Sequence, residues 1–168
     1  MRIAITGHTK GLGLAIYNHF VAHGHTVLGF SRSNGYSLPE KYAEVVEAVK
    51  TCDYFFNNAH VDDIQATFIR DLHDDTNIIT SGSMAANFPK MHAYASNKLK
   101  IQEEHIRHRR ISSKNMLLLK MGFLENYVDK YPIPYKTVLK IVDFWMDNPR
   151  ISMVEVENDR LVYKQLEV

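Results

Sequence analysis

The sequence has few of the features that mark secreted, fibrous or membrane proteins. Cysteine occurs once among 168 residues, at Cys52, so no disulfide can form within the chain and we expect a reducing, cytoplasmic location. Glycine (8) and proline (5) are too scarce for a collagen-like or linker-dominated protein. The longest apolar run, from Met116 to Leu124, is interrupted by Lys120, which predicts no membrane span. Arg2 directly precedes a strand-like Ile-Ala-Ile segment rather than a long apolar stretch, so we expect no secretory signal.

Neither positive nor negative charge is in excess. Lys and Arg number 20 against 19 Asp and Glu, a net charge of +1, which excludes a strongly basic nucleic-acid-binding surface and an acidic tail. The nine histidines include His19 and His23, four residues apart, but no cysteine completes a tetrahedral ligand set. We therefore expect neither a metal site nor a nucleic-acid partner. The length suits one globular domain over residues 1–168.

Short apolar runs alternate with helical patterns along the whole chain. The runs predict strands, and apolar residues at helical spacing predict helices. A capping-box pattern from Ser37 to Glu40 predicts the start of the second helix. Because most strands are continuously apolar, we expect an α/β fold: a doubly wound, mainly parallel sheet of about six strands with helices on both faces. The predicted strands are 1–5, 26–30, 53–57, 77–80, 115–121 and 151–156, and the predicted helices 11–23, 37–49, 61–72, 93–110 and 134–146.

A glycine-rich turn lies between the first predicted strand and the first helix. It reads Thr-Gly-His-Thr-Lys-Gly-Leu-Gly over residues 6–13, a G-x-x-x-G-x-G spacing. Gly7 allows a tight turn, Gly11 lets the backbone approach a phosphate, and Gly13 lets the helix pack closely on the strand. The unpaired N–H groups at the helix start would face a pyrophosphate. An ordinary glycine-rich turn remains the alternative, but the position at the first strand–helix junction favours dinucleotide binding.

Two basic residues near this turn indicate which dinucleotide is bound. Lys10 precedes the second motif glycine, and Arg32 follows the second predicted strand. An acidic residue at that strand end would bind the ribose hydroxyls of NAD, but Ser31 and Arg32 leave that role unfilled. A guanidinium offers bidentate hydrogen bonds to a 2′-phosphate. The pair therefore favours NADP(H) over NAD(H), with solvated surface charges as the alternative.

A tyrosine, a lysine and a serine together suggest proton-transfer chemistry. Tyr94 and Lys98 are spaced to share one face of a helix, a pairing that also arises by chance. Ser81 lies at the end of the fourth predicted strand, and Asn-Asn-Ala-His over residues 57–60 ends the third, so all lie at the edge where parallel sheets bind ligands. A nearby Lys⁺ lowers the pKa of a phenol toward neutrality by favouring the phenolate. The three side chains cover the proton donor, its activator and a polariser for a carbonyl oxygen.

In this order, the glycine turn, the 57–60 segment, Ser81 and the Tyr94–Lys98 pair resemble the short-chain dehydrogenase/reductase family, in its shorter, non-extended branch. The resemblance implies a Rossmann-type fold, with Tyr94 as general acid/base and Lys98 as the ribose-binding, pKa-lowering partner. It implies that Ser81 hydrogen-bonds the substrate carbonyl. The cofactor contacts that it implies are Gly7, Thr9, Lys10, Gly11, Leu12, Gly13, Ser31, Arg32, Asn58, Ala59, His60, Tyr94, Lys98, Gly122 and Leu124.

The sequence also departs from the family pattern. One strand–helix unit is missing between the second strand and the Asn-Asn-Ala segment, and we identify no counterpart of the family's proton-relay asparagine. His60 stands where glycine is usual, and the substrate-covering segment after Gly122 is cut to about a dozen residues. We therefore predict an NADP(H)-dependent oxidoreductase acting on a small carbonyl or alcohol. The alternative is a non-catalytic, regulatory dinucleotide-binding protein that lacks a substrate lid. The family pairs two long helices in its dimer; only the helix from Ala93 keeps that length, and a homodimer remains our expectation.

Overall fold

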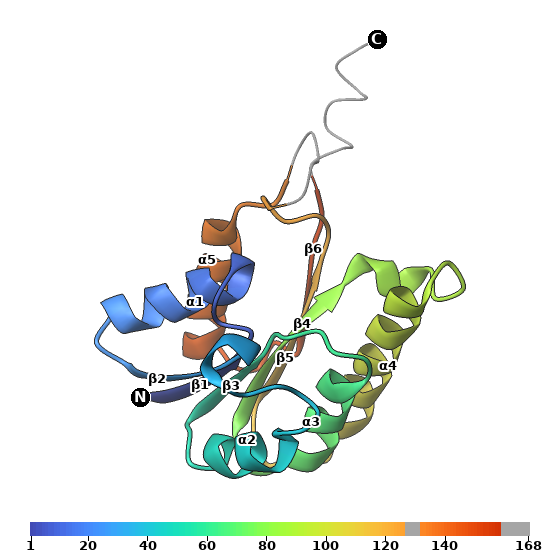
Figure 1. Ribbon diagram of the computed structural model, residues 1–168. Coiled ribbons are helices and arrows are strands. Elements are labelled where there is room, and N and C mark those ends of the chain that lie inside the picture. The colour runs from blue at the N-terminus through green and yellow to red at the C-terminus, as the bar shows by residue number, and fades with distance from the viewer. Residues whose placement is uncertain (127–131, 159–168) are drawn as a thin grey trace.

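The computed structural model describes residues 1–126 and 132–158, which form one six-stranded sheet with helices on both faces (Figure 1). All paired strands are parallel, and their order is β2-β1-β3-β4-β5-β6. The predicted doubly wound α/β fold is confirmed. The strands are β1 (Arg2–Thr6), β2 (Thr26–Phe30), β3 (Tyr54–Asn57), β4 (Asn77–Ser83), β5 (Met116–Met121) and β6 (Met153–Val156).

The helices divide into two layers. One face of the sheet carries α1 (Gly11–Ala22) and α5 (Tyr135–Asp147). The other carries α2 (Tyr42–Val49), α3 (Ile64–Leu72) and α4 (Ala93–His108). Two short 3₁₀ helices, η1 (Arg32–Asn34) and η2 (Met84–Asn87), follow β2 and β4. Within residues 1–126 and 132–158, none of the helices combines the length and apolar character needed to cross a membrane.

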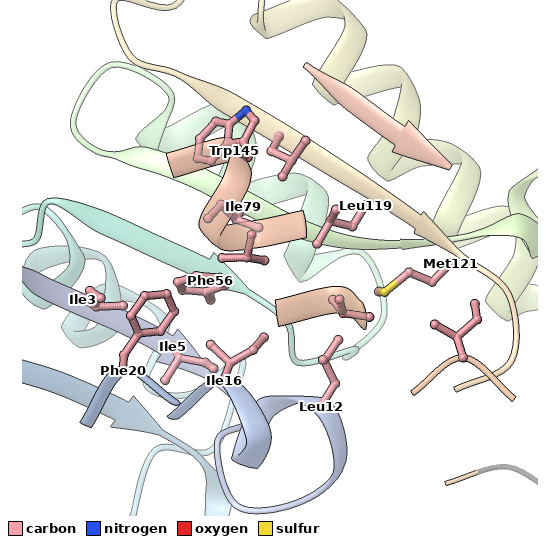
Figure 2. Close-up of a cluster of buried hydrophobic side chains, with 14 residues drawn as sticks. Ile3, Ile5, Leu12, Ile16, Phe20, Phe56, Ile79, Leu119, Met121 and Trp145 are labelled. Carbon is pink, nitrogen blue, oxygen red and sulfur yellow. The ribbon is translucent and has the colours of Figure 1, made fainter. Parts of the chain in front are cut away.

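The core follows from the two-residue period of the strands, which sends alternate side chains to opposite faces. In β1, Ile3 and Ile5 face α1 and α5, whereas Ala4 faces α2 and α3. Figure 2 shows the first of these two apolar layers, in which Phe20 of α1 and Trp145 of α5 are fully enclosed. The apolar residues on both sides explain why the strands read as continuous hydrophobic runs.

The strand order places a topological switch at β1. The chain runs from β1 to β2 on one side and then crosses back to β3 on the other. A Rossmann sheet of order 3-2-1-4-5-6 would have a further strand outside β2. Here the segment 31–53 contains η1 and α2 and no strand, so β2 is the edge, as the shortened sequence predicted. The loops after β1 and β3 therefore flank the crevice where such sheets bind ligands.

Three predicted boundaries were wrong by three or more residues, and the others lie within two residues of the structure. The segment from Ser37 to Glu40 is a turn, in which Lys41 N donates to Ser37 O, and α2 begins only at Tyr42. Helix α3 begins at Ile64 because Asp62, with φ of 42°, interrupts any earlier helical turn. Strand β4 continues past Thr80 to Ser83, because its last three residues still pair with β5. Ser81, predicted at the end of the strand, therefore lies within it, with Gly82 and Ser83 still to follow.

Candidate functional site

The glycine turn has the backbone geometry that its spacing predicts. Gly7 and Gly11 adopt φ values of 73° and 56°, in the left-handed region that favours glycine. A Cβ at Gly13 would lie 2.0 Å from the carbonyl oxygen of Gly7, so only glycine allows the helix to approach the turn this closely. The close packing predicted for Gly13 is confirmed. The turn is tied to the end of β2 by a hydrogen bond from Gly7 N to Phe30 O of 2.7 Å.

The start of α1 is an electropositive surface. Lys10 precedes the helix without capping it by a side-chain hydrogen bond, and the first turn carries no acidic residue. The unpaired N–H groups and the helix dipole therefore favour an anion at this point. Thr9 and Lys10 are exposed beside it. Leu12 is only 6% exposed and packs into the apolar cluster, which leaves its backbone rather than its side chain for ligand contact.

The segment after β3 is locked onto the glycine turn by Thr6 and Asn58. The buried Thr6 Oγ1 accepts hydrogen bonds from Asn58 N and Ala59 N, each of 3.1 Å. Asn58 Nδ2 donates to Thr6 O at 3.1 Å, and Asn58 Oδ1 accepts from Ser81 Oγ at 2.9 Å. The Asn58 side chain thus joins the turn after β1 to Ser81 in β4. Thr6 was not predicted from the sequence as a site residue, although it directly precedes the first motif glycine.

Ser81 connects the two sides of the site. Its hydroxyl donates to Asn58, and its backbone carbonyl accepts a hydrogen bond from Lys98 Nζ of 2.9 Å. A hydroxyl has one proton to donate. The Ser81 hydroxyl therefore reaches a substrate oxygen as a donor only by releasing Asn58.

Lys98 holds a buried ammonium without a carboxylate partner among the described residues. It is 3% exposed, and its Nζ donates to Gln65 Oε1 at 2.7 Å as well as to Ser81 O. Burial lowers the pKa of Lys98 to about 8, because the charged form loses its hydration. The same nitrogen lies 5.4 Å from the centre of the Tyr94 ring. The structure therefore brings together the predicted tyrosine and lysine, with Ser81 held to the lysine by its backbone.

Gln65 is a residue of the site that the sequence prediction missed. Its Nε2 donates to Asn57 O at 2.7 Å, while Asn57 Nδ2 donates to Gln65 O at 2.7 Å. This exchange fixes the amide so that its oxygen faces Lys98. A signal was present in the sequence: Gln65 stands three and four residues before the apolar Phe68 and Ile69, on the face of the helix that must be buried.

Tyr94 occupies the first turn of α4 and is 40% exposed. The His60 ring meets the Tyr94 ring edge-on, with centroids 4.8 Å apart and an interplanar angle of 78°. The His92 ring lies farther away, at 5.9 Å, and its Nδ1 caps the helix by accepting a hydrogen bond from Ala95 N. Burial, reinforced by the charge of Lys98, lowers the pKa of His60 below its ordinary value.

The two basic residues predicted to bind a phosphate follow adjacent strands. Thr6 pairs with Phe30 at the ends of β1 and β2, so the turn with Lys10 and the 3₁₀ helix with Arg32 start at the same edge of the sheet. Both side chains are exposed, and neither forms an ion pair with a residue that the structure describes. Ser31 directly precedes η1 as its N-cap residue, and its N–H donates to Asn34 Oδ1.

The last two predicted contacts have structural roles in the fold. A Cβ at Gly122 would lie 2.1 Å from Asn158 Oδ1, and Asn158 exchanges two hydrogen bonds with the Phe123 backbone. Leu124 packs against the apolar cluster beneath α1 and α5. Packing alone therefore explains why glycine stands at position 122 and leucine at position 124. In the described part of the chain, no group of three His, Cys, Asp or Glu side chains is placed to hold a metal ion.

Comparisons of sequence and of structure give different results. No known family profile and no curated protein matches the sequence. The structure is similar to 3-alpha-hydroxysteroid dehydrogenase from Pseudomonas sp. B-0831, solved with NADH (TM-score 0.71, 16% identity, all of both chains). It is also similar to UDP-N-acetylglucosamine 4-epimerase from Bacillus cereus (TM-score 0.72, 17% identity, 93% of this chain and 77% of that one).

A third similar structure is an oxidoreductase of the short-chain dehydrogenase/reductase type from Brucella ovis, with a TM-score of 0.68 and 13% identity. That match covers 92% of this chain and 99% of the other. Identities this low establish the fold and leave the chemistry to the residues of the site. The resemblance predicted from the motifs is confirmed at that level: the chain has the Rossmann-type fold of short-chain dehydrogenases/reductases.

Proposed function

We propose that the protein is an NADP(H)-dependent oxidoreductase that moves a hydride between the nicotinamide and a small carbonyl or alcohol. One observation carries the proposal: Asn58 is hydrogen-bonded to the glycine turn and to the Ser81 hydroxyl, and the Ser81 backbone carbonyl accepts from Lys98, whose Nζ lies 5.4 Å from the centre of the Tyr94 ring. These contacts couple the cofactor-binding edge of the sheet to the proton-transfer group. The similar structures, which include an NADH-bound dehydrogenase, add support from the fold.

The residues of the turn fit a dinucleotide. The left-handed glycines and the uncapped start of α1 form a cradle suited to a pyrophosphate. Arg32 and Lys10 would hold a 2′-phosphate, and Ser31 replaces the acidic residue that NAD requires. Lys98 would bind the nicotinamide ribose. When bound, the cofactor supplies or accepts the hydride, and the protein handles the proton.

In the reductive direction, Tyr94 gives its phenolic proton to the substrate oxygen as the carbonyl becomes an alcohol. The ammonium of Lys98, 5.4 Å from the ring centre, stabilises the phenolate that remains and so lowers the cost of the transfer. Ser81 leaves Asn58 and donates its hydrogen bond to the same substrate oxygen. With its pKa lowered to about 8, Lys98 carries this charge at pH 7 and loses it in the alkaline range.

A second candidate function is dinucleotide binding without turnover. Two observations favour it: Tyr94 is 40% exposed, so the described residues do not shield it from water, and the Ser81 proton is committed to Asn58. The two candidates share the cofactor and differ in whether Tyr94 changes the rate of any reaction.

Calorimetric titration with NADPH and NADH tests the cofactor assignment. NADPH should bind at least about tenfold more tightly, because a charge-assisted bidentate contact is lost with NADH. Arg32→Ala should remove most of that preference. Arg150→Ala is the matched control, because this exposed arginine precedes β6 at the opposite edge of the sheet. Equal affinities, or no effect of Arg32→Ala, would contradict the NADP assignment; failure to bind either cofactor would overturn both candidate functions.

A further inference from the structure

We propose that His60 exchanges the proton of Tyr94 with solvent water, a role that rests on the proposed oxidoreductase function. His60 is exposed at the edge of the site, in the segment that follows β3. Its imidazole packs edge-on against the Tyr94 ring, with centroids 4.8 Å apart. His60 therefore contacts both the Tyr94 ring and the surrounding water, and its ring lies closer to Tyr94 than that of His92 does.

The route beneath Tyr94 is closed to proton exchange. Lys98 Nζ donates hydrogen bonds to the side-chain carbonyl of Gln65 and to the backbone carbonyl of Ser81. Neither group takes up or releases a proton near neutral pH. Because Lys98 is 3% exposed and Gln65 is fully buried, a proton lost from this side could not be replaced from water. The proton that restores Tyr94 must then arrive from the open side.

The surroundings of His60 suit a carrier that is neutral at rest. Partial burial of the ring and the positive charge of Lys98 lower the pKa of His60, and the opposing carboxylate of Asp62 is too weak to reverse the shift. Tyr94 and His92 are the other titratable groups at this corner. A neutral imidazole both accepts and donates a proton. His92 is less suited, because its Nδ1 is committed to capping α4.

The proposed step balances without any oxidant or reductant beyond the cofactor. In reduction, the O–H bond of Tyr94 breaks as its proton joins the substrate oxygen, while the hydride from NADPH joins the carbon. Neutral His60 takes a proton from the solvent to become imidazolium and gives that proton to the phenolate, directly or through one bridging water. His60 thereby returns to its neutral form, and the net reaction consumes one proton from the solvent. In oxidation the same protons move in the opposite order.

Chemical rescue tests this role. We would follow NADPH oxidation at 340 nm with 9,10-phenanthrenequinone, an activated diketone, as probe. His60→Ala should lower kcat by about tenfold or more while leaving NADPH affinity within about twofold. Added imidazole should restore the rate, and the inflection of the wild-type pH profile on the acid side of neutrality should disappear in the variant. His92→Asn, which keeps a capping side chain, should retain its rate and ignore imidazole.

The other possible results of these rate measurements would each contradict either the role of His60 or the proposed function. A His60→Ala variant with the wild-type rate, or a loss that imidazole does not restore, overturns the proton-exchange role while the proposed function stands. A loss explained by weaker NADPH binding makes His60 a cofactor contact and likewise overturns the role. If the wild-type protein shows no turnover that depends on Tyr94, the proposed function fails, and the role of His60 fails with it.

Discussion

The two faces of the sheet are built from the same strands yet differ in what they bury. The face under α1 and α5 is an apolar cluster that runs the length of the strands (Figure 2). The face under α2, α3 and α4 also has apolar clusters, but it carries buried polar groups as well. The buried polar residues of this face are Thr6, Asn57, Gln65, Thr76, Thr80, Lys98, Glu104, His105 and Lys120.

The difference between the two faces separates the residues that mainly stabilise the fold from those that form the candidate site. Apolar burial stabilises the fold, whereas a buried polar group costs free energy unless it is hydrogen-bonded. Lys120 is compensated by Glu155 at 2.6 Å and by Asn87 at 3.1 Å. Lys98 has neutral acceptors and keeps a charge that the fold does not neutralise. An ammonium held in this way is expected where a charge is needed for chemistry.

The largest expected effect is on the apolar face. Trp145→Ala should lower the free energy of unfolding by about 4 kcal/mol, because the indole is 1% exposed and its loss leaves a large cavity. The affinity of the folded protein for NADPH should stay within about twofold, since Trp145 lies near the starts of the strands, away from the glycine turn. Urea denaturation and calorimetry measure the two quantities. A large loss of affinity with little loss of stability would contradict the division between the faces.

Gly13→Ala should come next, at about 3 kcal/mol, and should also weaken NADPH binding. Its Cβ would collide with the backbone of Gly7 at 2.0 Å, which forces the turn and helix apart. Gly24→Ala is the control: that glycine has φ of 77° and open space around it, so the cost should be about 1 kcal/mol with no change in affinity. Equal costs for both substitutions, measured by denaturation, would show that the close approach does not constrain the turn.

The buried lysine predicts a pH dependence of stability. The pKa of Lys98 is about 8 in the folded protein and about 10.4 when unfolded, so the unfolded chain binds more protons between these values. Stability should therefore rise with pH across this interval, by about 2 kcal/mol relative to Lys98→Met, which has no such proton. Urea denaturation of both proteins from pH 7 to 10.5 gives the difference. Parallel curves would mean that Lys98 is not desolvated.

The smallest effect compares two neighbours on β4 that face opposite sides. Thr80 is fully buried, and its hydroxyl has no hydrogen-bond partner among the described residues. Thr80→Val should therefore stabilise the protein by about 1 kcal/mol. Ile79→Val, which shortens a side chain on the apolar face, should destabilise it by a similar amount. Thermal unfolding shows whether each substitution raises or lowers the stability. A destabilised Thr80→Val variant would indicate a hydrogen-bond partner for the Thr80 hydroxyl.

Most of the fold could be predicted from the sequence, because apolar periodicity and glycine turns act locally. Each of the six predicted strands and five predicted helices is present, although α2, α3 and β4 have other boundaries. The missing unit after β2 was visible as a gap too short for a further strand and helix. The errors occurred where pairing or turn chemistry overrides local preference. Ser83 stays in β4 because β5 continues beside it, and Asp62 delays α3 by its left-handed backbone.

The site could be predicted in part. The motif spacing predicted Ser81, Tyr94 and Lys98 as site residues, because they are recognisable by residue type and by their order in the chain. Gln65 and Thr6 were missed, since they act through hydrogen bonds to partners 33 and 52 residues away in the chain. Such contacts depend on which strands become neighbours in the tertiary structure, and local sequence patterns do not predict this. The commitment of the Ser81 proton to Asn58 was hidden for the same reason.

In the proposed function, Tyr94 transfers the proton that accompanies hydride transfer. The most direct test is the rate of NADPH oxidation with 9,10-phenanthrenequinone for the wild-type protein and Tyr94→Phe. Removing the phenolic proton should lower kcat by about 100-fold or more while NADPH affinity stays within about twofold. A Tyr94→Phe variant that retains the wild-type rate, or a wild-type protein that binds NADPH and turns over no diketone, would contradict the account.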